Sequence, residues 1–289
     1  MAKIAVGSEA QSPQQSHEEG LQQASSLARG EGWCADEVVC TAGPHDRAFE
    51  EQHSRTSLAV VVSGTFQYRT STGQELMSPG SLLLGNRGDV FSCGHEHSVG
   101  DRCISFHYAE ELCDDLAGAG RRKTFGVARI PPLRELAPVT ARLATMLRSR
   151  VDESAMQEIA LQLMERATRL QGRLSRRHRA PDASSLARIT RVLRRIEAEP
   201  EAPCSLRDLA AEARLSPFHF LRCFESVAGA TPHQYLLRLR LRRAAIRLKE
   251  EKTRILDIAL DCGFGDVSNF NRSFRAEFGK TPRVYRQIA

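Results

Sequence analysis

Phe220-Leu-Arg-Cys-Phe-Glu-Ser-Val-Ala-Gly-Ala-Thr-Pro232 returns fifty residues later as Phe270-Asn-Arg-Ser-Phe-Arg-Ala-Glu-Phe-Gly-Lys-Thr-Pro282. Both stretches share the frame F-x-R-x-F-x4-G-x-T-P. Two Phe residues at i, i+4 spacing share one helix face, so the Arg between them points away from it. A Gly then ends the helix and Thr-Pro begins the next one. The pattern therefore predicts a duplicated helical unit in the C-terminal third of the chain.

A second repeat precedes this frame, at residues 205–213 and 254–262. The first copy begins with Ser205 and has an acid three residues later, which is typical of a capped helix start. Ala210 and Ala259 are small enough to let a second helix cross closely. A short turn follows each copy, so the order is helix, tight turn, helix, as in helix-turn-helix motifs. An exposed Arg on each trailing helix suits reading of two neighbouring stretches of DNA groove.

The C-terminal region, from about residue 188 to 287, resembles the DNA-binding domain of the AraC/XylS family of transcription regulators. The string D-x-A-x3-G-F-x4-N-F-x-R-x-F-x4-G-x-T-P, here Asp257 to Pro282, is the hallmark of that family. The resemblance implies two helix-turn-helix units joined by a rigid helix, whose counterpart here is residues 231–249. It also implies base contacts from the positions that match Phe218, Leu221, Arg222, Ser268, Asn269 and Arg272.

Helix geometry predicts a similar set of DNA contacts. With the Phe pairs facing the core, Glu225, Asn271 and Arg275 also turn outward. Arg can take guanine bidentately and Asn can take adenine, whereas Phe218 and Leu221 offer apolar contact. The predicted base contacts are Phe218, Leu221, Arg222, Ser268, Asn269, Asn271 and Arg272. The alternative for Arg222 and Arg272 is pairing with nearby acids or with phosphate.

A further group of residues on or near the joining helix, and after the second unit, could contact phosphates. The Thr positions are favoured because helix starts bind anions. A solvated helix face is the alternative for each of the others. The predicted phosphate contacts are Thr231, His233, Arg238, Arg240, Arg242, Arg275, Thr281 and Arg283.

The excess of positive over negative side chains lies in this C-terminal part. Residues 183–289 hold 20 Lys and Arg against 12 Asp and Glu, whereas the remaining residues hold 21 against 23. A clustered positive domain favours a polyanionic partner, because bound phosphates release counterions. Double-stranded DNA is therefore the expected partner.

The N-terminal part has a different character. Residues 1–30 are rich in Gln, Ser, Glu and Gly, and we expect a flexible leader there. From about residue 38 to 108, short β-type runs alternate with turn signals such as Ser63-Gly64 and Pro79-Gly80. This predicts an antiparallel barrel or sandwich within a sensor domain at 31–172. The expected fold is thus α+β with two domains: an antiparallel β-barrel with accompanying helices, then an all-α domain at 186–289.

Residues 38 to 110 resemble a cupin-type barrel, the ligand-sensing fold common ahead of AraC-type domains. Cupin enzymes hold a metal with two closely spaced His, a Glu and a later His, whereas His53 stands alone here where an H-x-H pair is expected. A second candidate metal set is Cys93, His95, His97 and Cys103, since the first three share one side of an extended strand. A polar surface turn with ordinary thiols is the alternative, and no cofactor is otherwise expected.

Two helical stripes follow the barrel, in the segment from about residue 133 to 171. We expect these helices to form the seam of a homodimer, or else to cover the barrel. Residues 173–185 contain several Arg and a Pro without an apolar stripe, and are predicted to be a basic linker.

The function predicted from these features is transcription regulation rather than catalysis. The barrel would sense a small-molecule or chemical-stress effector and alter how the C-terminal domains sit on DNA, with RNA polymerase as a protein partner. The alternatives are a cupin-type metal oxygenase, a thiol-based methyl-accepting repair protein fused to a DNA-binding domain, and a nucleoid-type protein with weak sequence choice. The chain lacks a signal peptide or an apolar run of membrane length, so we expect a cytoplasmic location, with the eight Cys as thiols.

Overall fold

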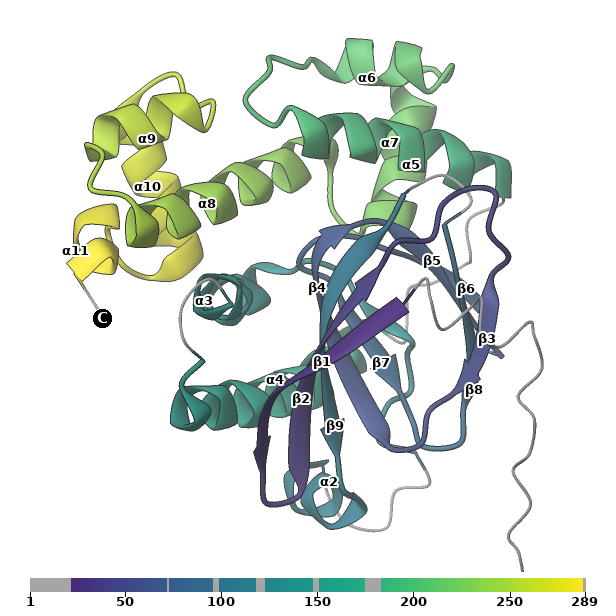
Figure 1. Cartoon of the computed structure of the whole chain (residues 1–289). Helices are drawn as coiled ribbons and strands as arrows, with labels where there is room; N and C mark the ends of the chain where they lie inside the picture. Colours follow the sequence, from purple (N-terminus) through teal and green to yellow (C-terminus); the bar gives the residue numbers. More distant parts are fainter. Residues whose placement is uncertain are drawn as a thin grey trace, which may run out of the picture.

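The computed structural model describes residues 22–71, 73–95, 99–117, 123–147, 151–174 and 183–287, with the backbone alone given for Phe49 and Ala183. Figure 1 shows the strands gathered in one body and the helices from α5 onward in a second body beside it. The expected division into an antiparallel-sheet N-terminal region and a helical C-terminal region is confirmed.

The N-terminal body contains two antiparallel sheets. The first sheet has the order β1-β2-β9-β4-β7-β10, and the second has the order β3-β8-β5-β6. The strands of the first sheet are β1 Gln22–Gly30, β2 Trp33–Cys40, β9 Asp101–Tyr108, β4 Thr56–Gly64, β7 Leu82–Gly85 and β10 Arg129–Ile130. The strands of the second sheet are β3 Phe49–Gln52, β8 Val90–Gly94, β5 Phe66–Thr70 and β6 Gly73–Met77.

Strand β1 corrects the prediction of a flexible leader over residues 1–30. Residues 22–30 pair with β2 along its whole length, from Gln22 opposite Cys40 to Gly30 opposite Trp33. The run is polar because β1 is an edge strand whose side chains are mostly exposed, so hydrophobicity gave no signal. The rest of the predicted leader lies outside the described residues.

The first sheet separates two interiors. Ile104, Phe106 and Tyr108 of β9 face a core shared with the helices, whereas Cys103 belongs to a cluster on the opposite face. The alternation expected for this strand is therefore present. The accompanying helices are α2 Glu110–Ala117, the 3-10 turn η1 Arg134–Leu136, α3 Ala137–Met146 and α4 Glu153–Leu174.

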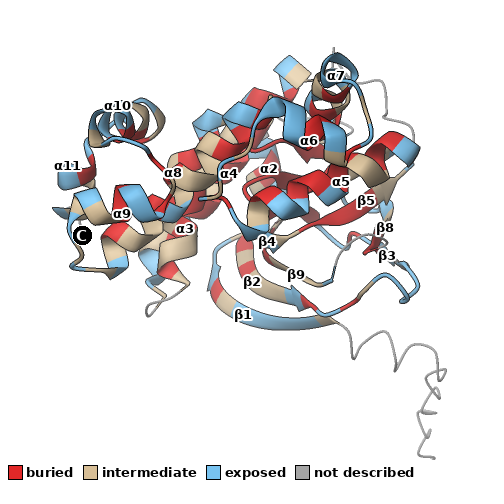
Figure 2. Cartoon of the chain, turned by 90° about the horizontal axis from the view of Figure 1, so that it is seen from above, coloured by how far each residue is buried: buried red, intermediate tan, exposed pale blue. Residues whose placement is uncertain are grey.

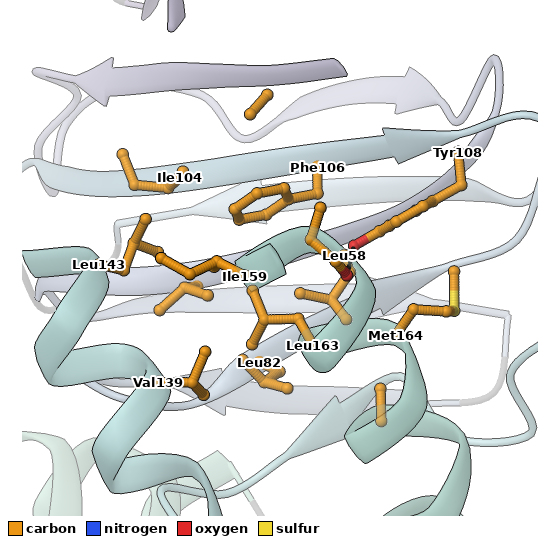
Figure 3. Packing of buried hydrophobic residues seen from close by; sticks show 14 of the residues in the cluster. Leu58, Leu82, Ile104, Phe106, Tyr108, Val139, Leu143, Ile159, Leu163 and Met164 are labelled. Carbon is orange, nitrogen blue, oxygen red and sulfur yellow. Dashed lines mark hydrogen bonds between the residues drawn. The ribbon is translucent and has the colours of Figure 1, made fainter. Parts of the chain in front are cut away.

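Helices α3 and α4 use their apolar stripes within the chain. Val139 and Leu143 of α3 and Ile159 and Leu163 of α4 are at most 2% exposed and pack on the sheet, as Figure 3 shows. The stripes predicted as a dimer seam therefore cover the sheet, which was the second of the two readings. A seam on the stripes is wrong, because the same residues cannot be buried twice.

The C-terminal body is built around the long helix α8, with one helix pair near each end (Figure 2). Its helices are α5 Ala183–Ala198, α6 Leu206–Glu212, α7 Pro217–Ala228, α8 Pro232–Glu250, α9 Ile255–Asp261, α10 Val267–Phe278 and α11 Pro282–Gln287. Of the linker predicted at 173–185, residues 175–182 lie outside the described part, α4 ends at Leu174 and α5 begins at Ala183. Among the described helices, none combines the length and apolarity that a membrane span requires.

The two bodies are joined by buried polar contacts. Arg129 of β10, whose side chain is 3% exposed, donates hydrogen bonds to the carbonyl oxygens of Val227 (2.7 Å) and Ala228 (3.3 Å) at the end of α7. The Nη1 atom of Arg129 also lies 3.7 Å from Oε2 of Glu75 on β6. Ala137 and Ala141, on the side of α3 away from the sheet, pack in the cluster formed by α8, α9 and α10. Helix α3 therefore lies between the sheet and the helical body.

Candidate nucleic-acid interface

Helix α7 has a well-defined start, core face and end. The side chain of Ser216 accepts a hydrogen bond from the backbone N–H of His219, and Gly229 ends the helix in a left-handed conformation at φ 74°. Phe220 and Phe224 are fully buried, with ring centroids 5.6 Å apart. These contacts fix the rotation of the helix about its axis, and with it the direction of the residues between the two Phe.

Helix α10 repeats this arrangement. Asp266 caps its start through the N–H of Asn269, and Gly279 ends it at φ 74°. Phe270 and Phe274 are fully buried with centroids 5.4 Å apart. Seen from above, α7 and α10 lie along the same edge of the molecule (Figure 2). The duplicated sequence frame therefore corresponds to a duplicated local structure.

The opposite faces of both helices are exposed. Phe218 is 72% exposed, and the guanidinium carbon of Arg222 lies 6.0 Å from the centre of its ring. On α10, Arg272 contacts Asn269 Oδ1 at 3.4 Å. Leu221 is half-buried, and the outward set on α10 is exposed throughout: Ser268, Asn269, Asn271, Arg272 and Arg275. Among the described residues, no ion pair involves Arg222 or Arg272. Neither guanidinium is therefore neutralised by a neighbouring carboxylate in this structure.

The turns before α7 and α10 have different residues at the position that adopts a left-handed backbone conformation. Arg214 adopts a left-handed conformation at φ 54°, and Gly263 occupies the corresponding place at φ 85°. A Cβ on Gly263 would lie 2.8 Å from Glu201 Cα. Both helix pairs thus turn through a left-handed residue, with Gly only where the backbone of another segment approaches closely.

Three residues predicted to contact phosphate, Arg238, Arg240 and Arg242, instead bind carbonyl groups of the protein. Arg240 donates to the carbonyl oxygens of Pro200, Glu201, Ala202 and Gly263. Its guanidinium thus joins two loops, and is not free for DNA in this conformation.

The other two corrected arginines face the N-terminal body. Arg242 donates to the carbonyl oxygen of Pro79 at 2.9 Å, and Arg238 donates to that of Pro132 at 3.0 Å. These three arginines are not carried forward as phosphate contacts. The sequence did not disclose their roles because their partners lie 23 to 163 residues away along the chain.

The remaining candidates for phosphate contact are positioned differently. His233, Arg275, Thr281 and Arg283 are exposed, and Thr231 is half-buried at the start of α8, where its hydroxyl accepts from the N–H of Gln234 at 3.2 Å. A shallow hollow on α10 is lined by Asn271, Arg272, Arg275, Ala276 and Thr281. Base and phosphate candidates are therefore contiguous on the second unit.

The N-terminal body contains a cavity of about 220 Å³ between its two sheets, with lining residues that include His53, Cys93, Cys103 and His107. His53 Nε2 lies 2.8 Å from the hydroxyl of Tyr68, and its ring stacks on Phe91 at 4.2 Å. Burial lowers the pKa of His53 to about 4, and burial also lowers that of His107. Both imidazoles are thus favoured in the neutral form.

The metal set predicted from the sequence is only partly described. Cys93, His95 and Cys103 are buried near one end of this body, whereas His97 lies outside the described residues. The structure brings together a group that the sequence did not indicate: Cys40, His95 and Asp101, whose ligand atoms all lie within 4.8 Å of one another. Cys40 and Asp101 are cross-strand partners in β2 and β9. The sequence could not indicate this group, because the pairing of β2 with β9 brings Cys40 and Asp101 together and cannot be read from residue spacing.

Comparison with known proteins identifies the C-terminal region. A family model described as a helix-turn-helix domain matches residues 209–288. The right origin-binding protein of Escherichia coli (strain K12) is 36% identical over 92 residues, which cover 32% of this chain and 32% of that protein. The HTH-type transcriptional activator RhaS of Klebsiella pneumoniae (strain 342) is 36% identical over 101 residues, covering 35% and 36%. The chain thus spans about a third of the length of these relatives.

One solved structure also aligns with part of this chain. The AraC-type DNA-binding domain protein of Chromobacterium violaceum is 34% identical, and the match covers 36% of this chain and 94% of that one with a TM-score of 0.34. The family resemblance predicted from the string Asp257 to Pro282 is confirmed for the C-terminal region.

Proposed function

We propose that this chain, whose C-terminal region is an AraC-type helix-turn-helix domain, is a sequence-specific DNA-binding transcription regulator. The observation behind this proposal is the repeated arrangement of α7 and α10. Each buries a Phe pair and exposes an Arg on its opposite face. We take α6 with α7, and α9 with α10, as two helix-turn-helix units.

The two trailing helices would enter the major groove with different chemistry. Helix α10 offers Ser268, Asn269, Asn271 and Arg272, which can form hydrogen bonds with base edges. Helix α7 offers the exposed ring of Phe218, with Leu221 and Arg222 beside it, for a more apolar contact. We therefore expect the second unit to account for more of the discrimination between bases.

Phosphate contacts would fix the position of these helices on the duplex. Thr231 lies at the start of α8 and Thr281 precedes α11, so each can offer a hydroxyl beside backbone N–H groups. His233, Arg275 and Arg283 complete the proposed set. Since these contacts carry no sequence information, their loss would weaken binding to all duplexes alike.

The N-terminal body would act as the sensor. Its two antiparallel sheets line a cavity of about 220 Å³, in a barrel of cupin type, and the effector would bind there. Contacts of Arg129, Arg238 and Arg242 offer a route from this body to α7 and to the joining helix α8. A homodimer on paired half-sites and contact with RNA polymerase complete the proposal.

The experiment is selection of binding sites from random duplex DNA with the full chain, followed by affinity measurements on the enriched sequence. We expect an enriched motif, and we expect Arg272→Ala to weaken its binding about 5- to 150-fold, equivalent to about 1 to 3 kcal/mol. Arg254→Ala is the matched control, since that side chain is 82% exposed in the same domain but lies off the trailing helices. Failure to enrich any motif at low ionic strength would reject the proposal.

A further inference from the structure

One end of the N-terminal body gathers metal-ligating side chains from both sheets. Cys40 is the last residue of β2, and Asp101, its cross-strand partner, is the first residue of β9. His95 directly follows β8 of the other sheet, and Cys93 and Cys103 line the adjoining cavity with Cys40 and Asp101. The cluster therefore depends on the closure of the two sheets upon each other.

The group is buried and already arranged around Asp101. His95 Nε2 lies 2.6 Å from Asp101 Oδ1, and their side chains are 1% and 7% exposed. The Cys103 thiol donates to Asp101 Oδ2 at 3.2 Å. The other ring nitrogen of His95, Nδ1, is buried and makes no hydrogen bond of standard geometry within the described part of the chain. The polar neighbours of the imidazole are the Cys40 thiol, with which it also interacts, and the Asp101 carboxylate. One buried point therefore presents a thiol, an imidazole and a carboxylate, three side-chain types that bind transition metals.

Two glycines hold this corner of the fold tight. Gly64 and Gly100 have φ of 80° and 64°, and the N–H of Gly100 donates to the carbonyl of Ala42 at 2.8 Å. A Cβ on Gly64 would lie 2.7 Å from the Asp101 Cα, and one on Gly100 would lie 2.8 Å from the Cys40 carbonyl oxygen. The backbone approach that positions Cys40 and Asp101 thus requires glycine at both places.

We propose that Cys40, His95 and Asp101 bind a borderline-soft divalent transition-metal ion of the zinc type. Thiolate and imidazole donors select zinc over calcium or magnesium, and a carboxylate serves such ions either as a ligand or as the group that orients the imidazole. Cys103, whose thiol touches Asp101, offers a fourth donor. Coordination forms a bond from the metal to the Cys40 sulfur and releases the thiol proton to solvent.

The site is connected to the DNA-binding region through β6. Met77 packs in the same cluster as Cys93 and Cys103, whereas its neighbour Leu76 packs in the C-terminal cluster with Phe220 and Phe224. Adjacent strand residues point to opposite faces, so β6 links the cluster beside the metal site to the core that holds α7. Resting on the proposed function, the inference is that the metal is an effector that changes DNA affinity.

The test uses the full reduced chain with Zn²⁺, and Co²⁺ as a spectroscopic probe. We expect one metal per chain and a thiolate-to-cobalt charge-transfer band in the near ultraviolet. Cys40→Ser should reduce the intensity of the band, since Cys103 is then the one thiol left in the proposed set, and should weaken Zn²⁺ binding tenfold or more. Cys113→Ser is the matched control because Cys113 is equally buried, at 4% against 5%, in the other core. An unchanged band in Cys40→Ser, or no band in the native chain, would overturn the site.

Affinity for the selected duplex is then compared with and without Zn²⁺ for the native chain and both variants. We expect at least a fivefold change in the native chain and in Cys113→Ser, and none in Cys40→Ser. If the chain selects a DNA motif but Zn²⁺ leaves its affinity unchanged, the effector role falls while the proposed function stands. If it binds Zn²⁺ through Cys40 but selects no motif, the proposed function falls while the metal site stands.

Discussion

The Phe residues on either side of Arg222 and of Arg272 decide where these two arginines point. Because Phe220 and Phe224 are fully buried, Arg222 is exposed, and the same holds for Arg272 between Phe270 and Phe274. This local rule was readable in the sequence, since helix periodicity alone sets it. The same rule failed for Arg240 and Arg242, whose long side chains reach carbonyl groups of distant segments. Partners that the fold supplies cannot be predicted from spacing.

The buried imidazole of His53 should make the free energy of unfolding depend on pH. Its pKa is lowered by burial from 6.5 to about 4, so between these values the unfolded chain binds a proton that the folded chain does not. The free energy of unfolding should therefore fall as the pH is lowered from 6.5 to 4, by about 3 kcal/mol. His53→Gln should remove that dependence in denaturant titrations.

Glu197 supplies the opposing control. Burial raises its pKa to about 7, against a hydrogen bond from Tyr235 that lowers it, so its contribution to stability is lost as the pH rises from 4.5 through 7. Glu197→Gln should remove this opposite trend and leave the His53 effect in place. Equal slopes in native chain and His53→Gln would contradict the assignment.

At the scale of elements, the two helix pairs show how far a sequence repeat predicts structure. Helices α7 and α10 end at Gly229 and Gly279, and α8 begins at Thr231, as the sequence indicated. Ser216 and Asp266, which cap the starts of α7 and α10, were not indicated by the sequence pattern. The edge strand β1 did not follow, because its residues are polar and mostly exposed. Strand pairing also determined the cluster of Cys40, His95 and Asp101, of which the sequence indicated only His95.

The two turns give a matched pair of stability predictions. Arg214 is exposed in a left-handed conformation, so Arg214→Gly should raise the free energy of unfolding by about 1 kcal/mol. Gly263→Ala should lower it by about 1 to 3 kcal/mol, because the added Cβ meets Glu201 Cα in the same strained conformation. Chemical denaturation measures both changes. Destabilisation by Arg214→Gly would show that the turn conformation is not as described.

At the scale of the whole molecule, the contact between the two bodies was not predictable. The sequence separated a sensor from a DNA-binding part, but it assigned Arg238 and Arg242 to DNA and gave no role to Arg129. In the structure all three hold the bodies together through carbonyl groups of the other body. Helix α3 adds to this contact by packing on the sheet with one side and on the α8 cluster with the other.

Arg129→Met tests this contact. The variant leaves the carbonyl oxygens of Val227 and Ala228 unpaired, which should cost about 1 to 3 kcal/mol. Hydrogen exchange should speed up at the end of α7 and the start of α8, while the α9 and α10 core stays protected. Arg142→Ala is the control, since its pair with Glu158 is 41% and 54% exposed and its loss should leave exchange unchanged.

In the proposed function, the exposed faces of α7 and α10 contact bases in successive major grooves. Guanine methylation interference on the selected duplex detects such contacts, because N7 of guanine lies in the major groove. We predict two interference sites about one helical turn, or about 10 base pairs, apart, with Arg272→Ala removing the one that α10 contacts. Binding that no guanine methylation disturbs, or an identical pattern in Arg272→Ala, would show that α10 does not contact bases through Arg272.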